Sequence, residues 1–264
     1  MTRTARGGIS RRSSSSKTSQ CVECLLQRLL CKLQVTDPNL SRSHSSFLKM
    51  TEAVENFSLK DVLADFKSCL GNDNQAVLMD YYLSGWKGLV KFMNSLGTIF
   101  TFVSKDAVAK IQIMEGYRNS AESDKYISLQ SMVAYELAAK LVDLEKRSDH
   151  PNSGCRTILR LHRALRWLQL FLDRLKTSTA ESKTSTMCTN AYNESLSNYH
   201  PWIIRKTATV AFCALPNRDA FFDVMNVGTS DEVMAMLNEA MPYVAEVYEI
   251  TQQLYAQHNL LDLP

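Results

Sequence analysis

The stretch Gly154–Lys176, GCRTILRLHRALRWLQLFLDRLK, limits the possible folds of this chain more than any other. Apolar residues recur there at spacings of three and four, which predicts an α-helix with two apolar faces. The first face consists of Ile158, Leu161, Leu165, Leu168, Leu172 and Leu175. The nearly opposite stripe begins with Arg156, Arg160 and Arg163 and continues with Trp167, Leu170 and Phe171. A helix with apolar contacts on both sides is usually packed between layers of other helices.

The arginines of the second stripe have no acidic partner along their own helix, because no Asp or Glu occurs between His150 and Leu172. Burying an unpaired cation is costly, so a partner has to come from elsewhere. The stripe therefore indicates a binding surface for an amphiphile with an anionic head and an apolar body. Solvated arginines over an ordinary core explain the same spacing equally well.

The rest of the chain from residue 51 onward also has helical periodicity. The predicted segments run from Ser58 to Gly71, from Asn72 or Asp73 to Gly97, Ser104–Tyr117, Tyr126–Lys146, Trp202–Leu215 and Asp219–Val227. Thr229 with Glu232 caps a last long helix that Pro242 should kink, and Thr177–Thr189 is expected to be a polar loop. No convincing period-two alternation occurs, so the sequence predicts an all-α protein of two packed layers.

The positive charge of the chain is concentrated in its first fifty residues. Residues 1–50 contain nine Lys and Arg but only Glu23 and Asp37, a net charge of +7, whereas the other 214 residues carry a net charge of −4. We expect residues 1–50 to be a disordered, Ser/Arg-rich extension and residues 51–264 to form one domain. A mitochondrial transit peptide fits the extension less well. The basic charge is thus no argument for nucleic-acid binding.

Composition and motifs favour a reduced, non-enzymatic protein. The seven cysteines are scattered and no signal peptide is recognisable, so we expect free thiols in the cytosol. Cys21 and Cys24 form one CxxC without a second pair at ligand spacing, so no metal site is expected. Hydrolase, dinucleotide, P-loop and zincin motifs do not occur, which predicts no catalytic residues and no cofactor. No apolar run approaches the roughly 20 residues that span a bilayer.

Two further stretches contain polar residues that could bind a ligand. In Gly97–Tyr117, Asp106 and Lys110 are four residues apart on one helix face. They could form an ordinary ion pair, or they could line one cavity together with the arginine helix. In Tyr199-His200-Pro201-Trp202, His200 could be a structural histidine or a ligand contact. Trp202 could belong to the core or lie at a membrane interface, where indole is favoured.

Together these stretches resemble the glycolipid transfer protein family. The resemblance rests on Phe100–Asp106, the Leu159–Phe171 segment of the arginine helix, and the Tyr199–Trp202 turn, and it extends over roughly residues 51–264. It implies a two-layer helical sandwich that encloses a lipid pocket and carries a sphingolipid between membranes.

The resemblance also implies roles for individual residues. The family's aspartate, which binds the ceramide amide and hydroxyl, falls on Asp106, and its histidine, which binds the amide carbonyl, falls on His200. Lys110 and Arg160 stand where glycolipid-binding members have an asparagine and a sugar-stacking tryptophan. Both departures fit the branch that binds ceramide 1-phosphate, in which Arg156 also contacts the head group.

We therefore expect a monomeric cytosolic carrier of ceramide 1-phosphate or a related sphingolipid. It would touch membranes transiently, with Trp202 as a weaker candidate for docking and with Golgi, plasma or endosomal membranes as candidate targets. The alternative is a helical adaptor whose arginine face binds a phosphorylated partner or an anionic membrane. A deep apolar cavity would distinguish the carrier from the adaptor. An enzyme that acts on lipid phosphates ranks third, because no nucleophile–base pair is visible.

Overall fold

The computed structural model describes residues 57–71, 75–97, 100–146 and 150–264. The predicted disorder of residues 1–50 concerns a part of the chain outside these ranges. Within them every regular element is a helix, and β-type pairing is limited to two isolated bridges, Leu70 with Val77 and Leu78 with Ser128. The predicted all-α class is confirmed.

Nine α-helices and two 3-10 turns make up the described part of the chain. The α-helices are α3 (Leu59–Cys69), α4 (Met79–Ser95), α5 (Thr101–Arg118), α6 (Leu129–Ala138), α7 (Gly154–Lys176), α8 (Thr184–Ser195), α9 (Trp202–Phe212), α10 (Arg218–Val224) and α11 (Ser230–Gln257). The 3-10 turns are η3 (Ser123–Tyr126) and η4 (Ser197–Tyr199). In this part of the chain no helix is long and apolar enough to cross a membrane.

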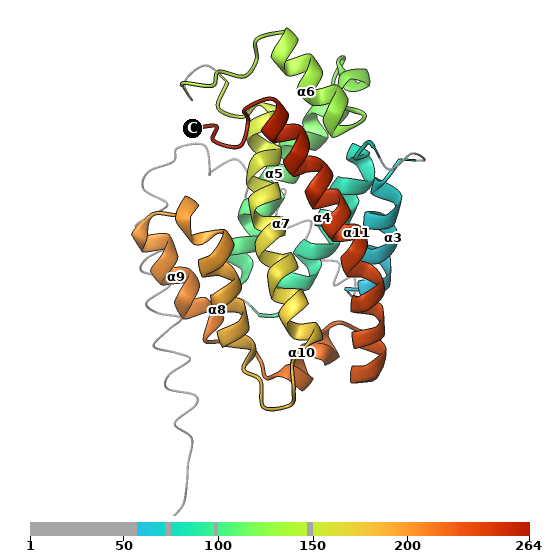
Figure 1. Cartoon of the computed structure of the whole chain (residues 1–264), viewed down its shortest axis with the longest axis vertical. Helices are drawn as coiled ribbons and strands as arrows, with labels where there is room; N and C mark the ends of the chain where they lie inside the picture. Colours follow the sequence, from blue (N-terminus) through green and yellow to red (C-terminus); the bar gives the residue numbers. More distant parts are fainter. Residues whose placement is uncertain (1–56, 72–74, 98–99, 147–149) are drawn as a thin grey trace, which may run out of the picture. The chain divides into compact units, whose positions relative to one another are not determined.

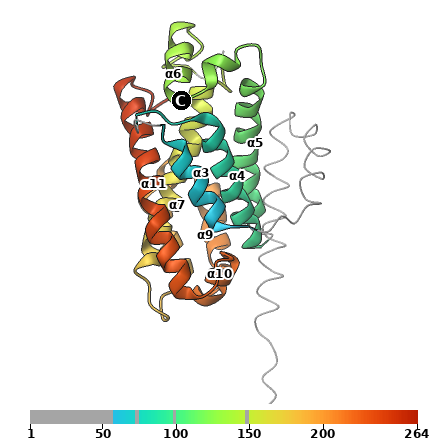
Figure 2. The same cartoon turned by 90° about the vertical axis from the view of Figure 1, so that its right-hand side faces the viewer.

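The helices form the two layers that the sequence predicts. Helices α3, α4 and α5 lie side by side in one layer (Figure 2). Helix α7 lies between α8 and α11 in the second layer (Figure 1). The layers meet where α3 packs on α11 and α5 packs on α7, while α6 packs on α7 and α9 packs on α8.

Helix α7 has the bounds that its periodicity predicts, and all six residues of its first apolar face are buried. The buried carboxylate of Glu136 accepts hydrogen bonds from the main-chain N–H groups of Gly154 (2.6 Å) and Cys155 (2.9 Å). An anion is favourable there, because the first N–H groups of a helix have no partner within it. A Cβ on Gly154 would lie 2.6 Å from the sulfur of Met132, so glycine permits the close approach of α6.

The predicted bounds of several helices are wrong: α9 and α10 each end three residues earlier than predicted, and α4, α5 and α6 differ as well. Helix α4 begins at Met79 rather than at Asn72 or Asp73, because the Leu78 N–H donates to the Cys69 carbonyl (2.8 Å) and holds the chain extended. Helix α5 begins at Thr101, three residues earlier than predicted. Helix α6 is shorter at both ends, since Ser128 caps its start and a left-handed Lys140 (φ 55°) closes its end.

The polar loop predicted over Thr177–Thr189 is confirmed only up to Lys183, because helix α8 begins at Thr184. Its sequence, TSTMCTNAYNES, is rich in residues of low helix propensity, so local preference gives little signal. Packing supplies the stabilisation instead, because Thr184, Cys188, Ala191 and Tyr192 recur at helical spacing and are buried. Helix α8 packs against α7, so the second layer is one helix wider than the sequence suggested.

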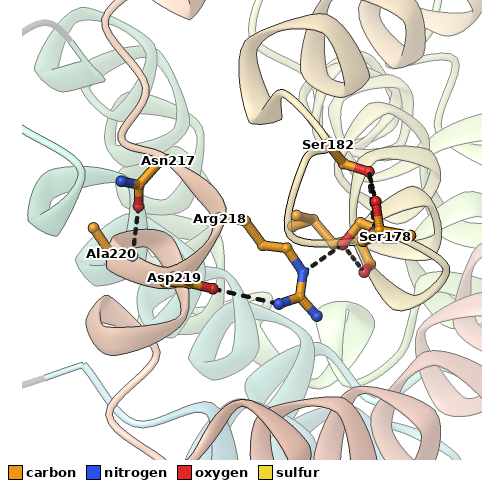
Figure 3. Close-up of polar contacts among 8 residues, drawn as sticks. Ser178, Ser182, Asn217, Arg218, Asp219 and Ala220 are labelled. Carbon is orange, nitrogen blue, oxygen red and sulfur yellow. Dashed lines mark hydrogen bonds and ion pairs between the residues drawn. The ribbon is translucent and has the colours of Figure 1, made fainter.

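Helix α10 is tied to the loop that follows α7 by one arginine (Figure 3). Asn217 caps α10 by accepting a hydrogen bond from the Ala220 N–H (3.0 Å). Arg218 donates from Nε to the hydroxyl of Ser178 (2.9 Å) and pairs with Asp219 at 3.4 Å. The contact between Arg218 and Ser178 therefore links α10 to the loop directly after α7.

Candidate functional site

A cavity of about 490 Å³ lies between α4, α5, α7, α8 and α9. Its buried wall is apolar and includes Trp86, Leu161, Trp167, Leu168 and Phe212. Six polar lining residues keep some solvent exposure and form what we call the polar rim: Asp106, Lys110, Arg160, Arg163, Tyr199 and His200. An apolar cavity with a few converging polar groups is typical of a small-molecule site, and its volume falls within the usual range of about 300–1,000 Å³.

Asp106 and Lys110 form the ion pair that their spacing allows, and both also belong to the polar rim. The Lys110 Nζ lies 2.6 Å from the Asp106 Oδ1. The Asp106 side chain is 71% exposed and that of Lys110 13% exposed. An ion pair with one exposed partner contributes little to stability. Lys110 can therefore leave Asp106 and bind an anionic ligand with little loss of protein stability.

His200 is held by Tyr192, whose hydroxyl lies 2.8 Å from the histidine Nδ1. Burial raises the pKa of Tyr192 to about 12, so the phenol stays protonated at neutral pH and donates this hydrogen bond. Burial also lowers the pKa of His200, although the charge of Asp106 opposes the shift. We therefore assign a neutral imidazole with its proton on Nε2. That N–H is available to a carbonyl oxygen of a ligand.

Helix α7 contributes two arginines to the polar rim, Arg160 and Arg163. The Nη2 of Arg163 donates to the main-chain oxygen of Leu261 (2.5 Å). Its guanidinium carbon also lies 3.9 Å from the ring centroid of Tyr199, which is a cation–π distance. Burial lowers the pKa of Arg163, but the group remains charged because arginine titrates far above neutral pH.

Arg156 lies one turn before Arg160 and does not line the cavity. It is 2% exposed, and its guanidinium donates to the main-chain oxygens of Pro264 and Asp143 and to that of Lys146 (2.7 Å). The structure thus gathers four of the five predicted binding residues around one cavity and places the fifth on main-chain oxygens. For Arg156, the partners expected from outside the helix are thus main-chain carbonyl groups.

Trp202 is 64% exposed at the start of α9, so it is not a core residue. Tyr199 and Ile203 beside it are also exposed large apolar side chains.

The sequence analysis did not identify Tyr192 as a site residue, because it lies on the unpredicted helix α8. In the described ranges, no cluster of three or more His, Cys, Asp or Glu side chains could hold a metal ion.

A second cavity, of about 20 Å³, lies between α3, α4, α7 and α11. Apart from Gln169, its lining is apolar and includes Leu59, Leu89 and Val244. Leu168 lines both cavities and therefore separates them.

A model of the family described as Glycolipid transfer protein (GLTP) matches residues 77–227. This chain belongs to the glycolipid transfer protein family. The ceramide-1-phosphate transfer protein of Xenopus tropicalis is 66% identical over 215 residues, which cover 81% of this chain and all of that protein.

Two solved structures share the fold. The mouse ceramide-1-phosphate transfer protein in its apo form is 58% identical, with a TM-score of 0.77. The human ceramide-1-phosphate transfer protein in complex with 2:0 ceramide-1-phosphate is 56% identical, with a TM-score of 0.76. Each comparison covers 79% of this chain and 100% of the other chain. The predicted family and two-layer fold are confirmed.

Proposed function

We propose that this protein carries a sphingolipid with a phosphate head group, ceramide 1-phosphate, between membranes by reversible non-covalent binding. The single observation that supports this most is a cavity with cations and hydrogen-bonding groups at its rim and an apolar wall behind them. The relatives point the same way, since the human relative is solved in complex with ceramide-1-phosphate.

In this proposal the head group binds at the polar rim. A phosphate monoester carries about −1.5 to −2 charges at neutral pH and three acceptor oxygens. The guanidinium of Arg160 can bind two of these oxygens in a fork, while Lys110 supplies a compact charge from α5. Once Lys110 turns to the phosphate, Asp106 can accept hydrogen bonds from the ceramide N–H and hydroxyl. His200 donates from Nε2 to the amide carbonyl.

The hydrocarbon chains follow the apolar wall. At about 0.8 kcal/mol per buried CH₂, two long chains resist leaving a bilayer by roughly 20 kcal/mol, so the protein must offer comparable apolar surface. The larger cavity is separated from the second, smaller apolar cavity by Leu168. We expect the chains to displace Leu168 and open the second cavity between the layers. No covalent step and no cofactor are needed, so the proposed activity is transport and not catalysis.

Membrane docking is assigned to the start of α9. Trp202 and Ile203 are exposed next to the rim residue Tyr199, and the exposed Arg205 and Lys206 follow on the same helix. Indole rings favour the bilayer interface and basic side chains favour its anionic surface. We propose that a monomer docks transiently through this surface and otherwise remains in the cytosol.

A vesicle transfer assay tests the proposal. The protein should move fluorescent ceramide 1-phosphate from donor to acceptor vesicles and leave glucosylceramide behind, because the sugar offers the rim cations no anion. Equal transfer of the two lipids would contradict phosphate selection. Binding to anionic vesicles without lipid uptake would instead favour the adaptor alternative.

A further inference from the structure

The segment after α11 is folded back onto α7 and anchored there. Asn259 adopts a left-handed conformation (φ 57°), which reverses the chain at the end of α11. The Leu260 N–H then donates to the Tyr255 carbonyl (2.8 Å). Leu260 and Leu263 are both buried in the core. Residues 260–264, which we call the C-terminal segment, are therefore folded and packed as part of the domain.

The main-chain oxygens of this segment accept hydrogen bonds from two arginines of α7. Leu261 binds Arg163, and Pro264 binds Arg156. Arg156 lies four residues before Arg160 and Arg163 lies three residues after it, so the two contacts flank Arg160 on the same helix stripe. Figure 1 shows the end of the chain beside the start of α7 and near the segment after α6.

These contacts fix the position of the positive charges, because the arginine side chain is otherwise long and flexible. A guanidinium that is held on two sides presents its charge in one direction, whereas a free one spreads over many rotamers. Arg163 is held by Leu261 on one side and by the ring of Tyr199 on the other. Arg156 is held by Pro264 together with the carbonyls of Asp143 and Lys146.

We infer that the C-terminal segment is a positioning element of the head-group site. It fixes Arg156 and Arg163 through main-chain oxygens, so that their charges add to that of Arg160 where a phosphate arrives. The segment acts through the arginines and makes no contact with the lipid. This inference rests on the proposed function. If the segment only completed the core, its loss would weaken the binding of charged and uncharged lipids in equal proportion.

The test measures dissociation constants for ceramide 1-phosphate and for ceramide, which lacks the phosphate, in the full chain and four variants. Deletion of residues 260–264 removes both oxygens. Leu263→Ala loosens only the anchor of Pro264, in case the deletion does not fold. Leu83→Ala is the matched control, because Leu83 is a buried leucine that lines neither cavity. Thermal melts report the stability of each variant.

We expect Leu263→Ala to lower the preference for ceramide 1-phosphate over ceramide about tenfold, the size of losing one hydrogen bond to a charged group. The deletion, which removes both acceptors, should lower it further. Leu83→Ala should lose stability and keep the wild-type preference. Leu263→Met, the fourth variant, should also keep that preference, because methionine conserves the buried apolar volume. A wild-type preference that persists in the folded Leu263→Ala variant would overturn this inference alone. A wild type that binds both lipids equally would overturn the proposed function and this inference with it.

Discussion

Replacing Arg160 by leucine is the sharpest perturbation of the rim. Arg160 lines the larger cavity from α7 and faces the same space as Lys110 from α5 and His200 before α9. Leucine removes the charge but keeps an apolar body on a helix that already buries leucines on two sides. The fold should therefore stay intact, and the substitution should weaken only the binding of the phosphate group.

The magnitude follows from the partial burial of Arg160. Truncating one partner of a fully desolvated charge pair costs about 2–5 kcal/mol. Because Arg160 is half-buried, the lower part of that range applies, about 2–3 kcal/mol, which corresponds to roughly a 30- to 150-fold weaker affinity. Ceramide has no phosphate, so its affinity should change little.

The assay is equilibrium binding of each lipid, with Arg166→Leu as the matched control. Arg166 lies on the same helix, but it donates to Gln169 (2.9 Å) and does not line the cavity. The Arg166→Leu variant should bind ceramide 1-phosphate as tightly as the wild type does. An Arg160→Leu variant of wild-type affinity, or equal losses in both variants, would refute the assignment of Arg160 to the phosphate.

Three further predictions test stability, docking and domain organisation. Burial lowers the pKa of His162 to about 4, so the unfolded chain takes up the proton first, and the free energy of unfolding should fall by roughly 3 kcal/mol as the pH drops from about 6.5 to about 4. His162→Gln should flatten this dependence in urea titrations; an equally steep curve would contradict it. Trp202→Ala should reduce vesicle binding in flotation assays while the free energy of unfolding stays within about 0.5 kcal/mol, because the side chain is exposed. Deleting residues 1–49 should leave transfer between neutral vesicles nearly unchanged, since they share no motif with the domain; near-complete loss of transfer would show otherwise.

The fold was predictable where hydrophobic periodicity was strong. Helix α7 has two apolar faces and a clear break before it, so its bounds and its place between layers followed from the sequence. Helix α8 did not follow, because its Thr, Ser and Asn residues have low helix propensity and it is stabilised by packing against α7. The start of α4 depends on a main-chain hydrogen bond between Leu78 and Cys69, which no side-chain pattern records.

The candidate site was predictable only in part. The arginine stripe indicated an anionic amphiphile, but the roles of Asp106 and His200 came from the family resemblance and not from spacing. The sequence could not show that Arg156 turns to main-chain oxygens, because carbonyl acceptors are present at every residue. The same reason hides the C-terminal segment: Leu261 and Pro264 act through oxygens that are independent of side-chain type.

A crystal structure of this protein with ceramide 1-phosphate tests the central claim most directly. The phosphate should lie within hydrogen-bonding distance of Lys110 and Arg160, the amide should lie between Asp106 and His200, and the chains should follow the apolar wall past Leu168. A phosphate bound outside the polar rim, or chains that remain on the surface while the cavity stays as it is, would contradict it.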